Sequence, residues 1–193
     1  MLARVILAAG ESRRMGTPKA LLPLRGRTFL EHLLAVTRHP RLGVTRVVLG
    51  AHASAIRDAV PLDDTSVVFN ENWQQGQLST IHAALRSLPA GQTEGMLLCP
   101  VDTPLISTAL ITELIARFDS SPKSIVLPAY LEKRGHPVIF PGSLFDELLH
   151  APADVGARAV VWAHAADVLE VPTVEEGCVL NLNEPENLRR VQL

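Results

Sequence analysis

Short apolar runs alternate with longer amphipathic stretches along almost the whole chain. The first run, Val5-Ile6-Leu7, ends in small residues, which is the pattern of a strand buried on both faces. Similar runs recur at residues 46–49, 66–69, 96–99, 124–127, 137–140 and 168–171. Stretches with the length and period of helices cover residues 28–38, 54–60, 78–88, 110–118, 142–149, 156–163 and 184–191.

This alternation predicts an α/β fold, in which a three-layer, doubly wound and mostly parallel sheet of Rossmann-like type has helices on both faces. Ser54 and Ser107 are predicted helix N-caps, and Ser143 stands four residues before Glu147 near another helix start. The segments 88–95 and 131–137 contain Pro or Gly and are predicted as loops, so we expect residues 1–193 to form one domain. Sheets of this kind bind ligands beyond the carboxyl ends of their strands.

Composition narrows the functional classes. The chain has 193 residues, of which 47% are hydrophobic, and a formal charge of −2, so a protein that coats nucleic acid is not expected. No apolar run approaches the length of a membrane span, and the apolar stretch near the first residue is too short for a signal peptide. These features predict a cytoplasmic protein. Cys99 and Cys178 lie in strand-like apolar runs and are predicted to be small buried hydrophobic residues.

Positive charge is concentrated at the start of the chain. Residues 1–27 contain six cations, Arg4, Arg13, Arg14, Lys19, Arg25 and Arg27, and the single acid Glu11. Directly after the first predicted strand comes LAAGESRRMGTPK, in which small residues permit close backbone approach and successive N–H groups can cradle an anion. The glycine spacing fits neither a P-loop nor a dinucleotide fingerprint. The loop therefore predicts a phosphate site of another kind.

The run LAAGESRRMGTPKALLPL resembles the signature of the molybdenum-cofactor nucleotidyltransferase family, which moves a nucleoside monophosphate from an NTP onto a phosphorylated acceptor. The resemblance implies that residues 1–105 mainly bind NTP and residues 106–193 mainly bind the acceptor. It implies that Arg14 and Lys19 bind the triphosphate, with Arg13 beside them. The base and ribose would lie against Leu7, Ala8, Ala9 and Gly10.

Further segments extend the resemblance over nearly the whole chain. Asn70, Gly76, Ser79 and Thr80 are similar to the family's third-strand loop, which contacts the nucleoside, although each residue taken alone fits an ordinary strand, turn and helix start. Asp102, in the sequence CPVDTPL after a predicted strand, resembles the family's magnesium ligand. Asn181 and Asn183 resemble the family's closing motif, in which one polar side chain reaches the metal, and they stand where the cytidylyl branch usually has aspartates. We therefore expect Mg²⁺ to bind better together with nucleotide than alone.

The acceptor is predicted from the second half of the chain. Gly135, His136, Pro137, Asp154 and Arg158 resemble the acceptor-side residues of the molybdopterin cytidylyltransferase branch. His136 is as compatible with a packing role as with a hydrogen bond to an acceptor phosphate. Ala9 favours CTP, whereas the paired asparagines are more like the guanylyl branch.

The resemblance thus predicts a nucleotidyltransferase that uses Mg²⁺, an NTP (CTP favoured) and a phosphorylated acceptor (molybdopterin favoured). Transient contact with a molybdoenzyme or its chaperone is a further expected partnership. Three alternatives stay open: a guanylyltransferase, an enzyme with another phosphorylated acceptor, and a non-catalytic nucleotide-binding or cofactor-delivery protein. Intact Arg14, Lys19 and Asp102 favour an enzyme.

Overall fold

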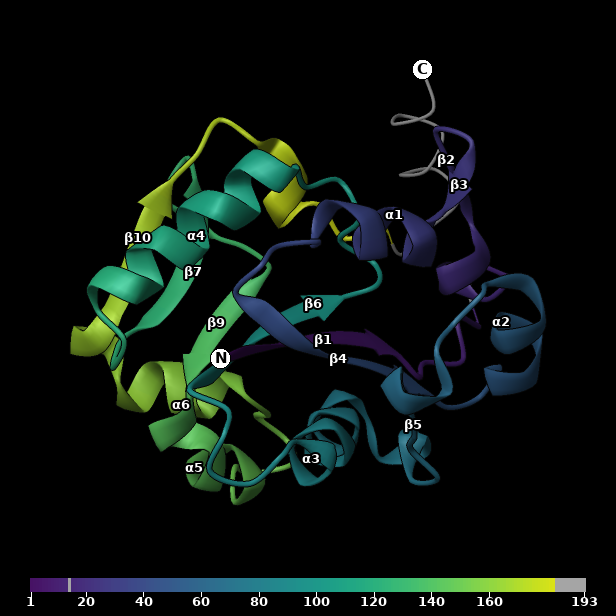
Figure 1. Cartoon of the computed structure of the whole chain (residues 1–193), viewed down its shortest axis with the longest axis horizontal. Helices are drawn as coiled ribbons and strands as arrows, with labels where there is room; N and C mark the ends of the chain where they lie inside the picture. Colours follow the sequence, from purple (N-terminus) through teal and green to yellow (C-terminus); the bar gives the residue numbers. More distant parts are fainter. Residues whose placement is uncertain (14, 183–193) are drawn as a thin grey trace.

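A twisted central sheet runs through the computed structural model, which describes residues 1–13 and 15–182 (Figure 1). The strand order is β10-β7-β9-β6-β1-β4-β5, with β8 paired to β7. Strand β9 is antiparallel to both neighbours, and the neighbouring strands β1, β4, β5 and β6 are parallel. The strands are β1 (Leu2–Ala8), β4 (Leu42–Leu49), β5 (Val67–Phe69), β6 (Gly95–Pro100), β7 (Ile125–Tyr130), β8 (Lys133–Arg134), β9 (Val138–Pro141) and β10 (Val168–Pro172).

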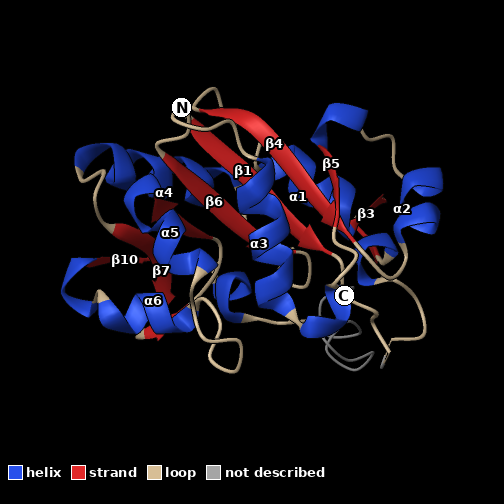
Figure 2. Ribbon diagram, turned by 90° about the horizontal axis from the view of Figure 1, so that it is seen from below, coloured by secondary structure: helices blue, strands red, loops and turns tan. Residues whose placement is uncertain are grey.

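Helices cover the sheet on both faces, as Figure 2 shows. They are α1 (Phe29–Val36), α2 (Ala53–Ala59), α3 (Gln77–Ser87), α4 (Thr108–Ser120), α5 (Phe145–Leu149) and α6 (Arg158–Ala163). Alternate residues of β1 supply two cores: Leu2 and Ile6 pack with α1 and α4, whereas Val5 packs with α3, α5 and α6. This period of two is the expected consequence of strand geometry, and it confirms the predicted three-layer α/β fold.

The predicted elements lie close to the observed ones, with several differences. Ser143 caps no helix, because the N-cap of α5 is Leu144, and β8 lies within the segment 131–137 that was predicted as a loop. Ser107 caps α4 by accepting a hydrogen bond from the backbone of Leu110, as predicted, but Ser54 lies inside α2, whose N-cap is His52. Cys99 is buried in β6, whereas Cys178 is buried in a 3₁₀ turn, Glu176–Val179, and not in a strand. The small hairpin β2 (Pro23–Leu24) and β3 (Arg27–Thr28) has no counterpart among the predicted elements. The predicted helix at 184–191 lies outside the described residues.

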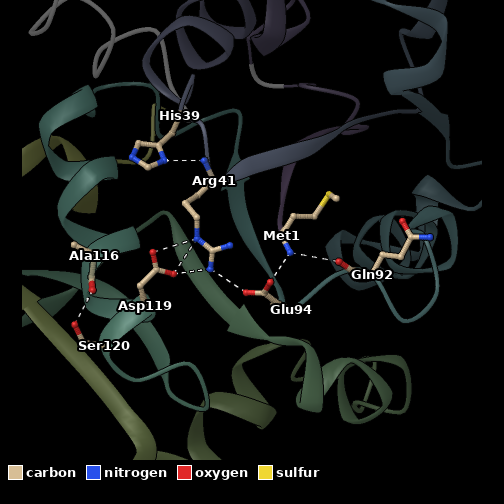
Figure 3. Close-up of polar contacts among 8 residues, drawn as sticks. All are labelled: Met1, His39, Arg41, Gln92, Glu94, Ala116, Asp119 and Ser120. Atoms are coloured by element: carbon tan, nitrogen blue, oxygen red, sulfur yellow. Dashed lines mark hydrogen bonds and ion pairs between the residues drawn. The ribbon is translucent and has the colours of Figure 1, made fainter.

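The ends of the strands opposite the ligand-binding edge are tied together by an ion-pair cluster (Figure 3). Arg41 donates to both carboxylate oxygens of Asp119 on α4 and to Glu94, which precedes β6. The amino group of Met1 also donates to Glu94, at 2.6 Å. The cluster therefore joins four segments that are distant in the sequence. None of the described helices has the length and apolar character that a membrane crossing requires.

Candidate active site

A cavity of about 260 Å³ opens at the carboxyl ends of β1 and β6, where the fold class predicts a ligand. Strand ends supply Leu7, Ala8 and Pro100, and the start of α3 supplies Gln77 and Thr80. The loop after β1 closes another side. Of the residues predicted for the nucleotide, Leu7, Ala8, Gly10 and Thr80 line this cavity together with Lys19 and Asp102.

The loop between β1 and the 3₁₀ turn Lys19–Leu21 is held by its own polar groups. The Ser12 hydroxyl accepts a hydrogen bond from the backbone N–H of Lys19 at 3.0 Å, and the Ser12 carbonyl accepts one from Met15. Ser12 has φ +55°, a left-handed conformation that is costly for a residue with a Cβ. His52 fixes the loop from outside, because its Nε2 lies 2.8 Å from the Glu11 carbonyl oxygen. These contacts within the protein fix the described parts of the loop at Glu11, Ser12 and Lys19.

Lys19 and Asp102 meet inside the cavity. The Lys19 ammonium nitrogen lies 3.3 Å from Oδ2 of Asp102, across 83 positions of sequence. The two side chains are only 17% and 25% exposed, so water screens this pair less than an ion pair on the open surface. A cation and a carboxylate thus lie next to each other at the carboxyl ends of the strands. This arrangement suits a phosphate group and a divalent cation that bind together.

Asn181 and Leu182, the last described residues, lie next to the segment that contains Asp102. The backbone N–H of Leu182 donates to the Asp102 carbonyl oxygen at 2.8 Å, which brings exposed Asn181 beside the Asp102 segment. Arg14 and Asn183 lie outside the described residues, so their predicted roles stay predictions.

Asp102 offers a carboxylate that is compatible with Mg²⁺ or Mn²⁺. No group of three or more His, Cys, Asp or Glu side chains that could hold a metal occurs within residues 1–13 and 15–182. Magnesium commonly binds through one or two carboxylates while substrate phosphates and water complete its shell. The donor set therefore fits a metal that arrives with nucleotide better than a closed protein site.

Asn70 organises the neighbouring loop from a buried position. Its side-chain amide donates to the hydroxyls of Ser79 and Thr80, at 2.9 and 3.1 Å, and its carbonyl accepts from the backbone of Asn72. Asn70 and Ser79 line a separate surface hollow and not the cavity with Lys19. Their placement indicates that they hold the start of α3, and direct contact with nucleotide stays a prediction.

A second cavity, of about 430 Å³, adjoins the first at the start of α3. Gln77 lines both cavities, and Gly76 lines the second. The second cavity brings together four of the five residues predicted for the acceptor: Gly135, His136, Asp154 and Arg158. The fifth, Pro137, is buried and follows a cis peptide bond with His136. Gly135 and Arg158, which are 23 positions apart, thus meet at one concave surface.

His136 is influenced by the opposite charges of Asp102 and Arg158. Burial lowers the pKa of His136 below its usual value, the Asp102 charge opposes this change, and the Arg158 charge adds to it. The imidazole is therefore neutral at pH 7. Its backbone N–H donates to the Cys178 carbonyl, and a Cβ at adjacent Gly135 would lie 2.5 Å from that oxygen. Gly135 is thus required for close packing as well as lining the cavity.

Two residues at the second cavity were missed in the sequence. Trp162, 59% exposed, lines it, and the Arg158 guanidinium lies 5.8 Å from the Trp162 ring centre. Their spacing of four residues on one predicted helix was the available signal. Gln77, which lines both cavities, carries no local motif and could be found only from the fold. Two other predicted residues lie away from both cavities: Arg13 pairs with Glu11, and Ala9 is buried beneath Gly50.

Comparison with known proteins identifies the family. Residues 4–168 match the model of the MobA-like NTP transferase domain. The chain belongs to this family. The predicted resemblance to this family is thereby confirmed.

Several relatives of this MobA-like chain have known structures or names. Rv0371c from Mycobacterium tuberculosis is 32% identical, with a TM-score of 0.83 over 100% of this chain and 98% of that one. A second structure of Rv0371c, in complex with manganese, is 31% identical with a TM-score of 0.79 and covers 99% and 97%. Nicotine blue oxidoreductase from Paenarthrobacter nicotinovorans is 31% identical over 80% of this chain and 78% of its own length.

Two other matches support less, one because it covers a small part of the relative and one because its sequence identity is low. The bifunctional protein GlmU from Azotobacter vinelandii is 36% identical over 58% of this chain, but the match spans only 24% of GlmU. A molybdopterin-guanine dinucleotide biosynthesis protein A from Archaeoglobus fulgidus has a TM-score of 0.72 over 99% of this chain and 97% of that one. Its identity of 19% supports the shared fold alone.

Proposed function

We propose that this MobA-like protein transfers CMP from CTP to the terminal phosphate of molybdopterin and releases pyrophosphate. The observation that carries the proposal is the junction of the two cavities at Gln77. On one side lie Lys19 and Asp102, and on the other lies a larger cavity with Arg158 and Trp162. Two phosphorylated substrates would meet where the cavities join.

The reaction is an in-line displacement at the α-phosphorus. An oxygen of the acceptor phosphate forms a bond to that phosphorus while the bond to the bridging oxygen of the β-phosphate breaks, and the electron pair leaves with pyrophosphate. A phosphate monoester is already ionised at neutral pH, so no strong general base is required. The work of the site is to hold two anions together and to neutralise the departing charge.

Each charged residue has a part in this scheme. Lys19 would bind the β- and γ-phosphates and neutralise pyrophosphate as it departs. Asp102 would hold Mg²⁺ or Mn²⁺, and Asn181 would be a neutral oxygen donor close by. Manganese is the metal of the Rv0371c complex. The metal supplies charge neutralisation on the phosphates when bound. Because Lys19 pairs with Asp102, free metal would have to compete with the ammonium group.

Molybdopterin is favoured by the chemistry of the second cavity. An exposed indole offers a face on which a planar ring system can stack, and Arg158 beside it can bind a phosphate through paired N–H groups. Apolar walls from Leu78, Ile81 and Phe140 complete the cavity. A planar heterocycle that carries a phosphate fits these three features. Ala9 supports CTP over GTP, through the resemblance of the first loop.

The acceptor assignment can be tested with two variants of the second cavity. Trp162→Leu should raise KM for molybdopterin about tenfold and leave KM for CTP unchanged, because only the stacking surface is lost. Arg158→Gln should raise the same KM. Arg117→Gln on α4, on the opposite face of the sheet, is the control. Equal activity of all three variants toward molybdopterin would contradict the assignment of this cavity.

Nucleotide choice can be measured separately. Thermal shift with Mg²⁺ and each of CTP, GTP, UTP and ATP should give the largest shift with CTP, since a ligand at a hundred times its Kd adds about 2.7 kcal/mol. A larger shift with GTP would support the guanylyl alternative. One relative is named an oxidoreductase, so a direct assay of phosphorus transfer is needed as well.

A further inference from the structure

A third cavity, of about 520 Å³, lies beside α1 and shares no lining residue with the two cavities of the candidate active site. Strand β5 pairs only with Val47–Leu49 of β4, so the earlier part of β4 has no strand on that side among the described residues. Gly43, Val44, Thr45 and Arg46 from this stretch form one wall. The end of α1 and the segment after α2 form the others.

Arg4 breaks the hydrophobic pattern of β1 at this cavity. Alternate residues of the strand face α1, and Leu2, Ile6 and Ala8 on that face belong to the core. Arg4 occupies the remaining position, where a strand buried between two helical layers normally has an apolar residue. A guanidinium at such a position is costly unless its charge is compensated.

The contacts of Arg4 are all with neutral groups. Its terminal nitrogens donate to the Leu34 carbonyl at 2.9 Å and to the hydroxyls of Thr37 and Thr45 at 3.2 and 2.8 Å. Its Nε is buried and has no hydrogen-bond partner among the described residues. Burial lowers the pKa of Arg4 below its usual value; Cys99 has a smaller effect that raises this pKa, and the Arg38 charge lowers it further. Among the described residues, none forms an ion pair that would neutralise the Arg4 charge.

Two more arginines line the same cavity. Arg38 is exposed at its rim, and Arg46 donates to the carbonyls of Thr45, Thr65 and Ser87. None of the ion pairs among the described residues includes Arg4, Arg38 or Arg46. Arg41, only three residues after Arg38, binds two carboxylates (Figure 3). Within residues 1–13 and 15–182, Arg41 thus forms ion pairs with acidic side chains, and the three arginines at the cavity form none.

The single carboxylate of the cavity wall is occupied locally. Asp63 accepts hydrogen bonds from the backbone and hydroxyl of Thr65, both at 2.9 Å, and these lower the pKa of Asp63. Three cations and one committed anion leave a net positive charge in a concave site. Guanidinium groups and hydroxyls such as Thr45 are the donors that bind phosphate oxygens.

We propose that this cavity, next to α1, binds a small phosphate-class oxyanion at a site separate from the candidate active site. Arg4 supplies the fixed buried charge and Arg38 the accessible guanidinium. The ligand is inorganic phosphate or the phosphate of a monoester. The Arg38 guanidinium can bind such an anion without a change in the fold.

Isothermal titration calorimetry of the full chain tests this proposal. Inorganic phosphate and glycerol phosphate are titrated separately into the Lys19→Gln variant, in which anion binding at the candidate active site is weakened. This variant is the parent for the further substitutions. Arg38→Gln added to this parent should weaken phosphate binding about tenfold, the loss expected for one charge-assisted contact. Arg117→Gln, which removes an exposed charge from α4, should leave it unchanged.

The two ligands distinguish the source of the anion. A preference for inorganic phosphate indicates free phosphate as the ligand, and a preference for the monoester indicates a phosphorylated metabolite. Equal affinity in the parent and in Arg38→Gln would overturn the proposal, as would an equal loss in Arg117→Gln. A second variant, Thr45→Val, should also weaken binding, because it removes the hydroxyl that holds Arg4.

Discussion

The Lys19–Asp102 pair is the residue-scale feature on which the active-site account depends. The Lys19 ammonium and the Asp102 carboxylate form an ion pair with each other. A bound metal–nucleotide complex would replace this pair with two stronger ones, phosphate with the ammonium and the metal cation with the carboxylate. Exchange of these partners explains why nucleotide and metal should bind together. It also makes each residue separately testable.

Asp102→Asn should reduce turnover at least about a hundredfold, because the variant loses the charge that holds the metal against the phosphates. The fold should be kept, since Asp102 contacts Leu182 through its backbone carbonyl. Steady-state transfer rates at saturating nucleotide measure the loss. Asp58→Asn on the exposed side of α2 is the matched control. Activity near that of the control would remove Asp102 from the metal.

Gly10 gives a steric test of the nucleotide cavity. A Cβ at this position would meet no atom within 4 Å, and Gly10 lines the cavity, so a larger side chain would enter ligand space without strain in the protein. Gly10→Val should leave the melting temperature within about 1 °C and raise KM for nucleotide at least about tenfold. Unchanged KM would show that nucleotide binds elsewhere.

At the scale of elements, hydrophobic period and cap chemistry carry most of the local information. Helix α1 begins with a capping box in which Thr28 and Glu31 bond each other's backbone, a pattern visible in the sequence. The antiparallel direction of β9 could not be read from its apolar run, because a buried strand has the same pattern in either direction. Ser54 has the residue type of a cap, but the chain becomes helical one residue earlier.

The turn between β7 and β8 lacks the residues that its geometry favours. Leu131 and Glu132 have φ +45° and +63°, although such turns normally contain Asn or Gly. Glu132→Gly should therefore raise the free energy of unfolding by up to about 1 kcal/mol, because relief of the left-handed strain exceeds the added entropy of the unfolded chain. Urea denaturation checks this. Glu132→Ala keeps the strain and should be neutral; equal stabilisation by both variants would contradict the explanation.

At the scale of the whole molecule, the sheet brings distant segments to one edge. The resemblance to the family predicted Lys19, Asp102 and the acceptor residues separately, but their meeting depends on strand order, which no local pattern encodes. The same applies to Gln77 and Trp162, whose importance appears only when two cavities adjoin. Arg4 shows the opposite case, in which residues close in the sequence lie far apart. It belongs to the N-terminal group of cations but lines the third cavity and not the one beside the nucleotide loop.

The ion-pair cluster around Arg41 predicts a pH dependence of stability. Hydrogen bonds from Arg41 and from the Met1 amino group hold the pKa of Glu94 at about 2, below its usual value of 4.5. A depressed carboxyl pKa contributes stability that is complete above about pH 5 and is lost as the pH falls toward 2. Glu94→Gln should therefore be less stable than wild type at pH 7, with a difference that shrinks steadily toward pH 3.

Urea denaturation between pH 3 and pH 7 measures that difference. Glu113→Gln, an exposed change on α4, should give no pH-dependent difference from wild type. A gap between Glu94→Gln and wild type that stays constant over the whole range would show that the cluster does not stabilise the fold through this ionisation.

The proposed transfer of a nucleoside monophosphate from an NTP to a phosphorylated acceptor can be followed with labelled nucleotide. The protein is incubated with Mg²⁺, molybdopterin and CTP labelled at either the α- or the γ-phosphorus. We predict that α-label appears in the acceptor product while γ-label appears in pyrophosphate, both only when acceptor and metal are present. CTP that binds without any α-label reaching molybdopterin or another phosphorylated acceptor would contradict it.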